Sequence, residues 1–366
     1  MISNQRLRQE IYPLTGIRAL AATWVVLYHM TGDEFKAWPH LNYLFAPILR
    51  HGYLGVDLFF ILSGFIIHYN YAGKLARFRI SAIGEFLWMR LARLWPVHAF
   101  LLVLFALLIW GQRRSGTLPG HPELYTARAF LWNVLLTQSW WIPLKDSWNV
   151  PAWSISCEWL AYLVFPFLIA SRLCTLSARL SAVVATLALV ATALICQIMQ
   201  PPGATYGVVR IAGEFLAGCA LCHVFQTGVI NHLPWHHIVS FTIIALLVSF
   251  YMVLPAFGLG GYCCLPLLGA IVLSLAYQRG FVARLCSTRV FLFGGYLSYS
   301  VYMVHNLCFI LLKRAGPWSG GERSLFVHLF VTFIASVLLF YGVEQPCRKA
   351  MRKVWQRHKQ RGVPVV

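Results

Sequence analysis

Charge is scarce in this 366-residue sequence. Only 11% of the residues are charged, whereas 59% are hydrophobic and the mean hydropathy is +0.67. A soluble domain carries about 25% charged residues. Because a soluble core could not bury so much apolar surface, the composition excludes an ordinary soluble globular protein and predicts an integral membrane protein.

Acidic residues are the scarcest of the charged ones. The chain has 11 Asp and Glu against 30 Lys and Arg, which gives a net charge of +19. The basic residues gather at the ends of apolar runs, where they suit a membrane surface with anionic lipids. We therefore expect membrane lipid, and no nucleic acid, as a partner.

Sequence signals of several other classes are missing. Most of the 10 cysteines lie in apolar runs. Cys219 and Cys222 form a CxxC pair without a second pair at zinc spacing, so we expect neither a metal site nor a disulfide framework. Residues 1–12 are polar and no small-residue cleavage pattern follows the first apolar run, so no cleavable signal peptide is expected. No internal repeat or low-complexity linker divides the chain, and we expect a single domain over residues 1–366.

Long apolar runs, by contrast, fill the sequence. A membrane helix needs roughly 17–25 residues, and a shorter run at 127–139 predicts a re-entrant or interfacial helix. The sequence thus predicts an all-α integral membrane protein of about ten transmembrane helices, with spans over about 13–343 and a basic cytoplasmic tail at 344–366. The long runs are 13–31, 53–71, 91–111, 150–171, 180–200, 206–226, 237–255, 262–279, 290–312 and 325–343.

The distribution of Lys and Arg predicts the orientation of these spans. If the N-terminus is cytoplasmic and 127–139 returns to the face from which it came, the cytoplasmic segments hold roughly twice as many Lys and Arg residues as the outer segments. Both termini are therefore predicted to be cytoplasmic. A full crossing by 127–139 would place the basic tail outside, which the same rule disfavours.

The first run contains two ionisable residues, Arg18 and His29. Placing such groups in lipid is costly, so each is a candidate for function. Their spacing of eleven residues corresponds to three helical turns plus about 20°, which places both on one face with about 16 Å between them along the axis. Arg18 would lie near the inner surface and His29 near the outer end. Alternatively, Arg18 snorkels to the surface and His29 caps the helix.

The next two runs add a carboxylate and a pair of arginines. Asp57 could cap its helix or pair with a basic group, and Gly64, next to Ser63, permits close backbone approach. Arg90 and Arg93 share a helix face, from which two guanidinium groups could hold a phosphate-bearing ligand. Positive-inside topology alone would also place arginines here.

Polar and aromatic groups are densest in the segment 148–166. Glu158 lies within an otherwise apolar helix, so it should face the bundle interior and a partner. Trp153 could instead belong to an interfacial aromatic belt. Farther along, Arg210 and Glu214 are spaced as an i, i+4 pair that could neutralise itself. The groups gathered at the mouth of the span are Trp148, Asn149, Trp153, Ser154 and Glu158.

Six short motifs follow one another along the chain. They are Arg18-x10-His29, Gly55-Val56-Asp57 with Ser63-Gly64, Arg90-x2-Arg93-x2-Pro96, Trp153-Ser154-x3-Glu158-x3-Tyr162-x3-Pro166, Ser298-Tyr299-x2-Tyr302-x2-His305 and Glu344-x-Pro346. Each is weak alone, but in this order, over about 14–346, they resemble the acyltransferase-3 family of membrane O-acyltransferases. The chain departs from the family at Val97-His98, where many members carry Tyr shortly after the proline.

The resemblance implies a fold of about ten helices with cytoplasmic termini, in the bacterial inner membrane. It implies acyl-CoA, usually acetyl-CoA, as a cytoplasmic donor. The implied acceptor is a hydroxyl, typically on a sugar of a surface glycan, a lipid-linked saccharide or a secreted metabolite. Some members carry a C-terminal esterase-like domain, which is not expected in this sequence. The positions that match residues the family needs are Arg18, His29, Arg90 and Arg93.

Transfer from thioester to ester defines the roles expected of these residues. The reaction needs a base for the hydroxyl, polarisation of the thioester carbonyl and a site for CoA. His29 is the expected base, because imidazole titrates near neutral pH, with Glu158 or Asp57 orienting it. A covalent route through Ser63 or Ser154 lacks an elbow motif. Expected at the donor site are Arg18, which also belongs to the catalytic set, Arg90 and Arg93. Expected around the substrate are Ser63, Trp148, Asn149, Trp153, Ser154, Tyr299 and His305.

Two other classes remain open at this point. A transporter or flippase of a glycan or lipid-linked substrate would fit the buried charges, although such proteins more often show repeated halves with broken helices. A structural or sensory membrane protein could retain the motifs without catalysis. The lack of an internal repeat argues against the first class, and the intact pair of Arg18 and His29 argues against the second.

Overall fold

The computed structural model describes residues 10–30, 39–116, 121–140, 147–170, 175–199, 207–316 and 322–360, and every regular element in them is helical. The elements are α1 (Tyr12–His29), α2 (Pro39–Leu49), α3 (Leu54–Leu75), α4 (Ile80–Arg114), η2 (Pro122–Leu124), α5 (Ala127–Val134), α6 (Ala152–Ala170), α7 (Ala178–Met199), α8 (Gly207–Thr227), α9 (Trp235–Val248), η4 (Ser249–Val253), α10 (Leu254–Phe257), η5 (Gly261–Cys264), α11 (Leu265–Ala276), α12 (Gly280–Cys286), α13 (Arg289–Arg314), α14 (Glu322–Leu339), η6 (Phe340–Glu344) and α15 (Gln345–Gln360). The predicted all-α class is therefore confirmed.

Each of the ten predicted apolar runs falls on a helix. Within the described residues, 7 helices are long and apolar enough to cross a membrane, or 8 if the bent pair Gly261–Ala276 and Gly280–Cys286 forms one span. The count of ten spans and the side of the membrane that the termini face stay predictions. The ends of some runs, at residues 31, 171, 200 and 206, and the last six residues of the predicted tail lie outside the described part of the chain.

Several segments expected to connect spans are helical instead. The predicted connection 32–52 contains α2, and the segment 72–93 is mostly taken up by the ends of α3 and α4. The basic tail forms α15, which continues from α14 through the π-helical turn η6 as one run of 38 residues, Arg323–Gln360. Amphipathic charged segments extend helices beyond the apolar run, and hydrophobicity alone therefore underestimates their length.

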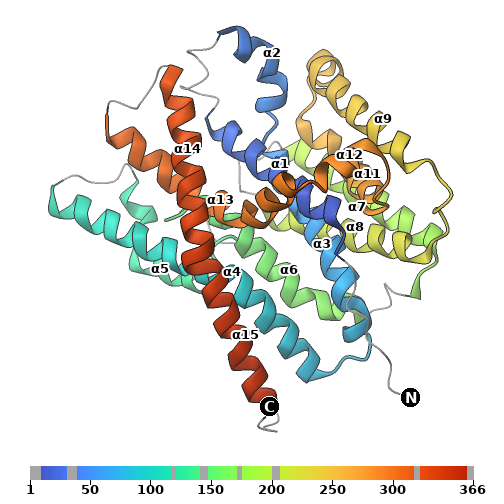
Figure 1. Ribbon diagram of the computed structural model, residues 1–366, viewed down its shortest axis with the longest axis horizontal. Coiled ribbons are helices and arrows are strands. Elements are labelled where there is room, and N and C mark those ends of the chain that lie inside the picture. Colours follow the sequence, from blue (N-terminus) through green and yellow to red (C-terminus); the bar gives the residue numbers. More distant parts are fainter. Residues whose placement is uncertain are drawn as a thin grey trace.

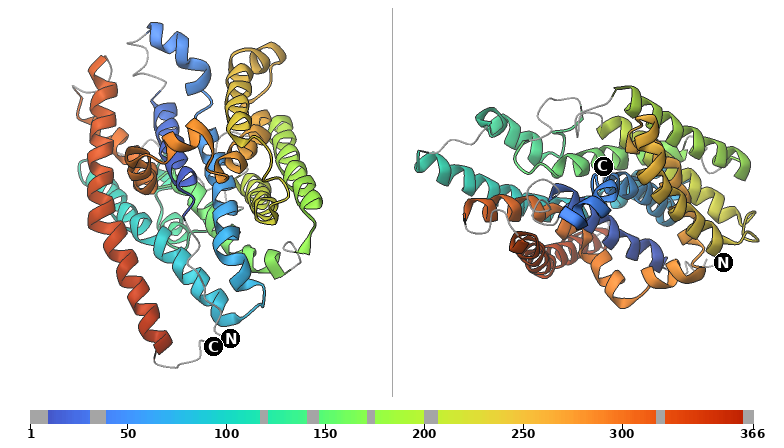
Figure 2. Two further views of the ribbon diagram at one scale, coloured as in Figure 1. Left: turned by 45° about the vertical axis from the view of Figure 1, so that its right-hand side comes forward. Right: turned by 90° about the horizontal axis from the view of Figure 1, so that it is seen from above.

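The bundle is built around α3, which packs against α1, α6 and α8 (Figure 1). The views in Figures 1 and 2 agree that α14 and α15 run as one rod along one flank, while α7, α9 and α11 lie on the opposite flank. The short run at 127–139 forms α5, whose 8 residues are too few to cross a bilayer. Helices α1, α3, α4, α6 and α13 together line the interior that holds the candidate site.

Two glycines let α3 and α8 touch backbone to backbone. A Cβ atom at Gly64 would lie 2.1 Å from the carbonyl oxygen of Phe215, and one at Gly218 would lie 2.1 Å from that of Ile61. The thiol of Cys219 donates to the Gly64 carbonyl at 3.3 Å. Small residues permit such approach between membrane helices, where dispersion contacts replace the hydrophobic effect. The close approach predicted at Gly64 is confirmed.

Gly64→Ala is therefore expected to destabilise the bundle. Overpacking typically costs about 1–3 kcal/mol, and here the clash is with backbone that cannot rotate away. Thermal unfolding of the purified protein in detergent measures the effect. Gly111→Ala in α4 is the matched control, because nothing lies within 4 Å of its added methyl group. Equal unfolding temperatures for the two variants would contradict the backbone contact.

Candidate active site

The helices enclose two neighbouring cavities. The first, of about 110 Å³, is lined by Arg18, Arg90 and Arg93 and is called the arginine cavity. The second, of about 540 Å³, is lined by His29 and is called the histidine cavity. Val56 and Tyr302 line both and form the shared wall. Arg18 and His29 thus both face the bundle interior, as their helical spacing predicts, but each reaches a different cavity.

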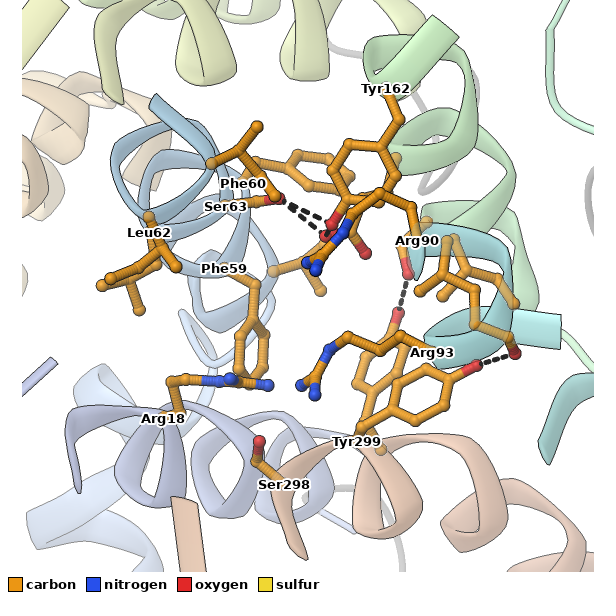
Figure 3. Close-up of a pocket in the computed structure, with 18 residues that line it drawn as sticks. Arg18, Phe59, Phe60, Leu62, Ser63, Arg90, Arg93, Tyr162, Ser298 and Tyr299 are labelled. Carbon is orange, nitrogen blue, oxygen red and sulfur yellow. Dashed lines mark hydrogen bonds between the residues drawn. The ribbon is translucent and has the colours of Figure 1, made fainter. Parts of the chain in front are cut away.

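Three guanidinium groups point into the arginine cavity (Figure 3). The Arg18 guanidinium carbon lies 6.0 Å from the centre of the Phe59 ring, and that of Arg93 lies 6.0 Å from the centre of the Tyr299 ring. Arg90 donates through Nη2 to the Tyr71 hydroxyl at 2.7 Å. No carboxylate of the described residues lies within ion-pair distance of these three arginines. Aromatic faces and a neutral hydroxyl position them, which leaves their charge available to an anion.

The carboxylate of the arginine cavity is already hydrogen-bonded. Ser63 donates to Glu158 Oε1 at 2.7 Å, and the Tyr162 hydroxyl donates to the same oxygen. The hydroxyl oxygens of Ser63 and Tyr162 are 3.1 Å apart (Figure 3). Glu158 therefore faces the interior with partners, as predicted. These bonds satisfy one carboxylate oxygen and link α3 to α6 across the cavity.

The histidine cavity presents one imidazole nitrogen as a base. His29 Nδ1 lies 2.8 Å from the carbonyl oxygen of Val25, one turn earlier in α1. A carbonyl only accepts, so Nδ1 must carry the hydrogen, and the neutral ring keeps Nε2 as its unprotonated nitrogen. The side chain is exposed to the cavity rather than packed in the core. The expectation that Glu158 or Asp57 orients His29 is corrected by this contact, because the helix backbone fills that role.

A second histidine packs against the first. The His305 ring centre lies 5.0 Å from that of His29, and the side chain is only 3% exposed. Its Nδ1 lies 2.6 Å from the carbonyl oxygen of Tyr302, whereas its buried Nε2 has no hydrogen-bond partner in the part of the chain that the structure describes. His305 was expected beside the substrate. The structure places it behind His29, outside both cavity linings.

A buried ion pair borders the histidine cavity. Arg210 donates through Nε and Nη2 to the two carboxylate oxygens of Asp57 at 2.9 and 2.8 Å. The guanidinium carbon also lies 5.0 Å from the centre of the Trp153 ring and 5.2 Å from that of Tyr262. Of the two alternatives for Asp57, pairing with a basic group is confirmed, whereas the capping role and the pairing of Arg210 with Glu214 are corrected. Asp57 does not cap α3, which has no side-chain cap, and Arg210 pairs with Asp57 rather than with Glu214.

The remaining predicted substrate residues divide into two groups. Ser63, Ser154 and Tyr299 line the arginine cavity, and Trp153 lines the histidine cavity. Ser154 donates to the Tyr302 hydroxyl oxygen at 2.8 Å, which ties α6 to the shared wall.

Trp148 and Asn149 line neither cavity. Trp148 has a φ of +58° and packs its ring between Tyr125 and Phe130, with ring centres 5.6 and 5.2 Å away. Asn149 Nδ2 donates to the carbonyl oxygen of Met303 at 2.9 Å. Both are buried packing residues at the start of α6, which corrects their assignment to the substrate.

Sequence reasoning missed much of the histidine cavity. Tyr53, Gln197 and Tyr262 line it and come from three different elements, so no sequence spacing joins them. The side-chain oxygen of Gln197 accepts from the Gly260 amide at 2.7 Å, and the Tyr53 hydroxyl accepts from the Gly261 amide at 3.1 Å. Arg210 carried a usable signal, because an arginine within an apolar run needs a buried partner.

A helical membrane bundle with an arginine-lined cavity beside a histidine-lined cavity fits the class of membrane-embedded acyltransferases. Residues 11–344 match the model of the family described as an acyltransferase domain, and the chain belongs to this family, acyltransferase-3. The match ends just before α15. The resemblance drawn from the six motifs is confirmed.

Curated relatives are similar over most of the chain. It is 24% identical to Acyltransferase MdmB of Streptomyces mycarofaciens, over 92% of each protein. It is 25% identical to Peptidoglycan O-acetyltransferase OatA of Listeria monocytogenes, over 93% of this chain and 56% of that protein, so it spans about half of the length of OatA. No solved structure matches the chain. The family and these relatives support O-acyl transfer as the class of activity.

Proposed function

We propose that this protein transfers an acyl group, most simply acetyl, from cytoplasmic acyl-CoA to a hydroxyl of a carbohydrate acceptor. The acceptor would be a surface polysaccharide, a lipid-linked saccharide or a glycosylated metabolite. The single observation that carries this proposal is the division of the interior. Three arginines that form no ion pair with a carboxylate of the described residues line one cavity, and an available imidazole base lines the next.

The arginine cavity suits the donor. CoA is a polyanion, and guanidinium groups bind phosphate oxygens in bidentate fashion. Arg18, Arg90 and Arg93 would hold the phosphates, and the pantetheine arm would extend toward the shared wall. The separation of about 16 Å along α1 between Arg18 and His29 is comparable to the reach of that arm. Glu158 lines the same cavity, but the three guanidinium groups outnumber this carboxylate and leave a positive balance for the phosphates.

The histidine cavity suits the acceptor. His29 Nε2 would take the proton of the acceptor hydroxyl as its oxygen attacks the thioester carbonyl. Collapse of the tetrahedral intermediate forms the ester, breaks the carbon–sulfur bond and returns the proton from His29 to the CoA thiolate. The Tyr302 hydroxyl, in the shared wall, donates to the Pro151 carbonyl oxygen at 3.1 Å and would turn this proton to the developing oxyanion. Aromatic rings of Tyr53, Trp153 and Tyr262 give the acceptor apolar faces to pack on.

The location proposed is the bacterial inner membrane, with the arginine cavity open to the cytoplasm. The donor is a cytoplasmic metabolite, so its phosphates must meet the protein on that side. The positive-inside distribution of Lys and Arg supports the same orientation.

Transfer of label tests the proposal directly. The purified full chain, reconstituted in liposomes, would receive acetyl-CoA labelled in the acetyl group, together with bacterial glycans and lipid-linked saccharides. We expect alkali-labile label in one acceptor class and release of free CoA thiol in equal amount. Absence of transfer from a series of acyl-CoA chain lengths, together with CoA-independent movement of a glycan across the bilayer, would replace the enzyme by a transporter.

A further inference from the structure

The last helix, α15, carries a basic face against α4. The Trp88 indole of α4 donates to the Met351 carbonyl oxygen at 2.9 Å, and the rings of Trp88 and Trp355 stack with centres 6.2 Å apart. Farther down, Lys359 Nζ lies 3.5 Å from Glu85 Oε2. These contacts fix the rotation of α15, so the residues that face α4 can be assigned from the helical period.

Two arginines, Arg348 and Arg352, occupy the N-terminal half of this face. Arg348, Arg352, Trp355 and Lys359 are spaced i, i+4, i+7 and i+11, and they therefore share one side of the helix. Trp355 and Lys359 meet α4 near its beginning. Arg348 and Arg352 lie toward the arginine cavity, and Arg348 is half-buried where Arg352 is exposed.

Arg348 lies within electrostatic reach of three other guanidinium groups and one carboxylate. The charged groups that act on it most strongly are Arg93, then Arg352 and Arg90, and Glu344 is the carboxylate among them. Glu344 is 2% exposed and accepts from Ser300 at 2.7 Å.

With Arg18, the described chain gathers five guanidinium groups here against two carboxylates that are already hydrogen-bonded, Glu158 and Glu344. Like charges held together in a partly buried site repel one another unless an anion lies between them. The cluster therefore has the charge of a site for a polyanion with several phosphate groups.

We propose that Arg348 and Arg352 bind the 3′-phosphate of the CoA donor and extend the arginine cavity to the protein surface. The inference rests on the proposed function, because the donor must be CoA. CoA carries its phosphates at two places, a pyrophosphate next to the pantetheine arm and a 3′-phosphate on the ribose beyond it. Arg18, Arg90 and Arg93 line the cavity that receives the arm, so the pyrophosphate meets them. The arginines of α15 lie farther out, where the ribose phosphate follows.

Binding of CoA and of 3′-dephospho-CoA to the purified full chain in nanodiscs tests this assignment. Wild-type protein should bind CoA more tightly by about ten- to a hundredfold, as expected for charge-assisted hydrogen bonds to one phosphate. In R348A/R352A this preference should fall close to unity through weaker binding of CoA alone. The control K349A/K353A removes two exposed charges from an adjoining face of α15, about 100° and 140° around the helix from Arg348, and should keep the wild-type preference.

The outcomes separate the inference from the proposed function and from lipid binding. Wild-type protein that neither binds CoA nor transfers label would overturn both proposals. Normal transfer with an unchanged preference for CoA in R348A/R352A would overturn the inference alone. So would an effect of R348A/R352A that follows the content of anionic lipid in the nanodisc and not the 3′-phosphate, because it would assign these arginines to phosphate headgroups.

Discussion

His29→Ala is expected to lower kcat by about 10²–10⁴-fold, the usual contribution of a general base. The KM for the acyl donor should stay nearly unchanged, because the substitution removes a group that acts on the transition state and leaves the arginine cavity intact. The unprotonated Nε2, fixed by the Nδ1 contact with the Val25 carbonyl, is what the variant loses. Release of CoA thiol by purified proteins at matched concentration measures both constants.

His232→Ala is a suitable control for this experiment. His232 is exposed in the turn after α8 and lines neither cavity, so its removal should leave turnover unchanged. A His29→Ala enzyme with wild-type kcat would eliminate His29 as the base. A rise in donor KM with unchanged kcat would instead assign His29 to donor binding.

Arg210→Ala is expected to be among the most destabilising single substitutions in the protein. Removing one partner of a buried ion pair costs about 3–5 kcal/mol, because the other charge stays buried without compensation. Arg210 and Asp57 are 2% and 0% exposed, and Glu214, also 0% exposed, acts on the same guanidinium. The variant would therefore leave the Asp57 carboxylate buried without its cation. Unfolding in detergent, followed by loss of helical signal, measures the change.

Comparison variants give an expected order. Asp57→Ala should cost less than Arg210→Ala, because Glu214 remains to balance the guanidinium. Glu85→Ala breaks the exposed pair with Lys359 and should cost about 0–1 kcal/mol. An Arg210→Ala protein as stable as Glu85→Ala would show that the Asp57–Arg210 pair does not contribute to the stability of the bundle.

The helices were predictable because their signal is local. Each apolar run became helical, and the spacing of Arg18 and His29 correctly placed both on the interior face of one helix. Helix ends were less predictable, since polar residues extend α4 and α15 past the apolar runs. An apolar run therefore predicts the position of a helix better than it predicts the residues at which the helix begins and ends.

Pairings between helices were not predictable in the same way. The i, i+4 rule joined Arg210 to Glu214, but packing of α3 on α8 brings Asp57 closer although it lies 153 residues away in the chain. The assignments of His305 and Trp148 to the substrate site were wrong for the same reason. Sequence spacing does not show that a side chain is buried behind a cavity or at a turn. The prediction that Glu158 faces the bundle interior was correct, because a lone carboxylate in an apolar helix must face inward whatever its partner.

The shared wall between the two cavities bears on whether protons can pass through the protein across the membrane. Val56 and Tyr302 are the only described residues that line both cavities, so these two side chains stand where the cavities adjoin. In the proposed orientation and location, the two cavities would open to opposite sides of a membrane that stores a proton gradient. Side chains that keep the two cavities from joining would also keep water and protons from passing between the two sides, while the acyl group would have only a short distance to cross. The same two residues would then keep the enzyme from becoming a channel.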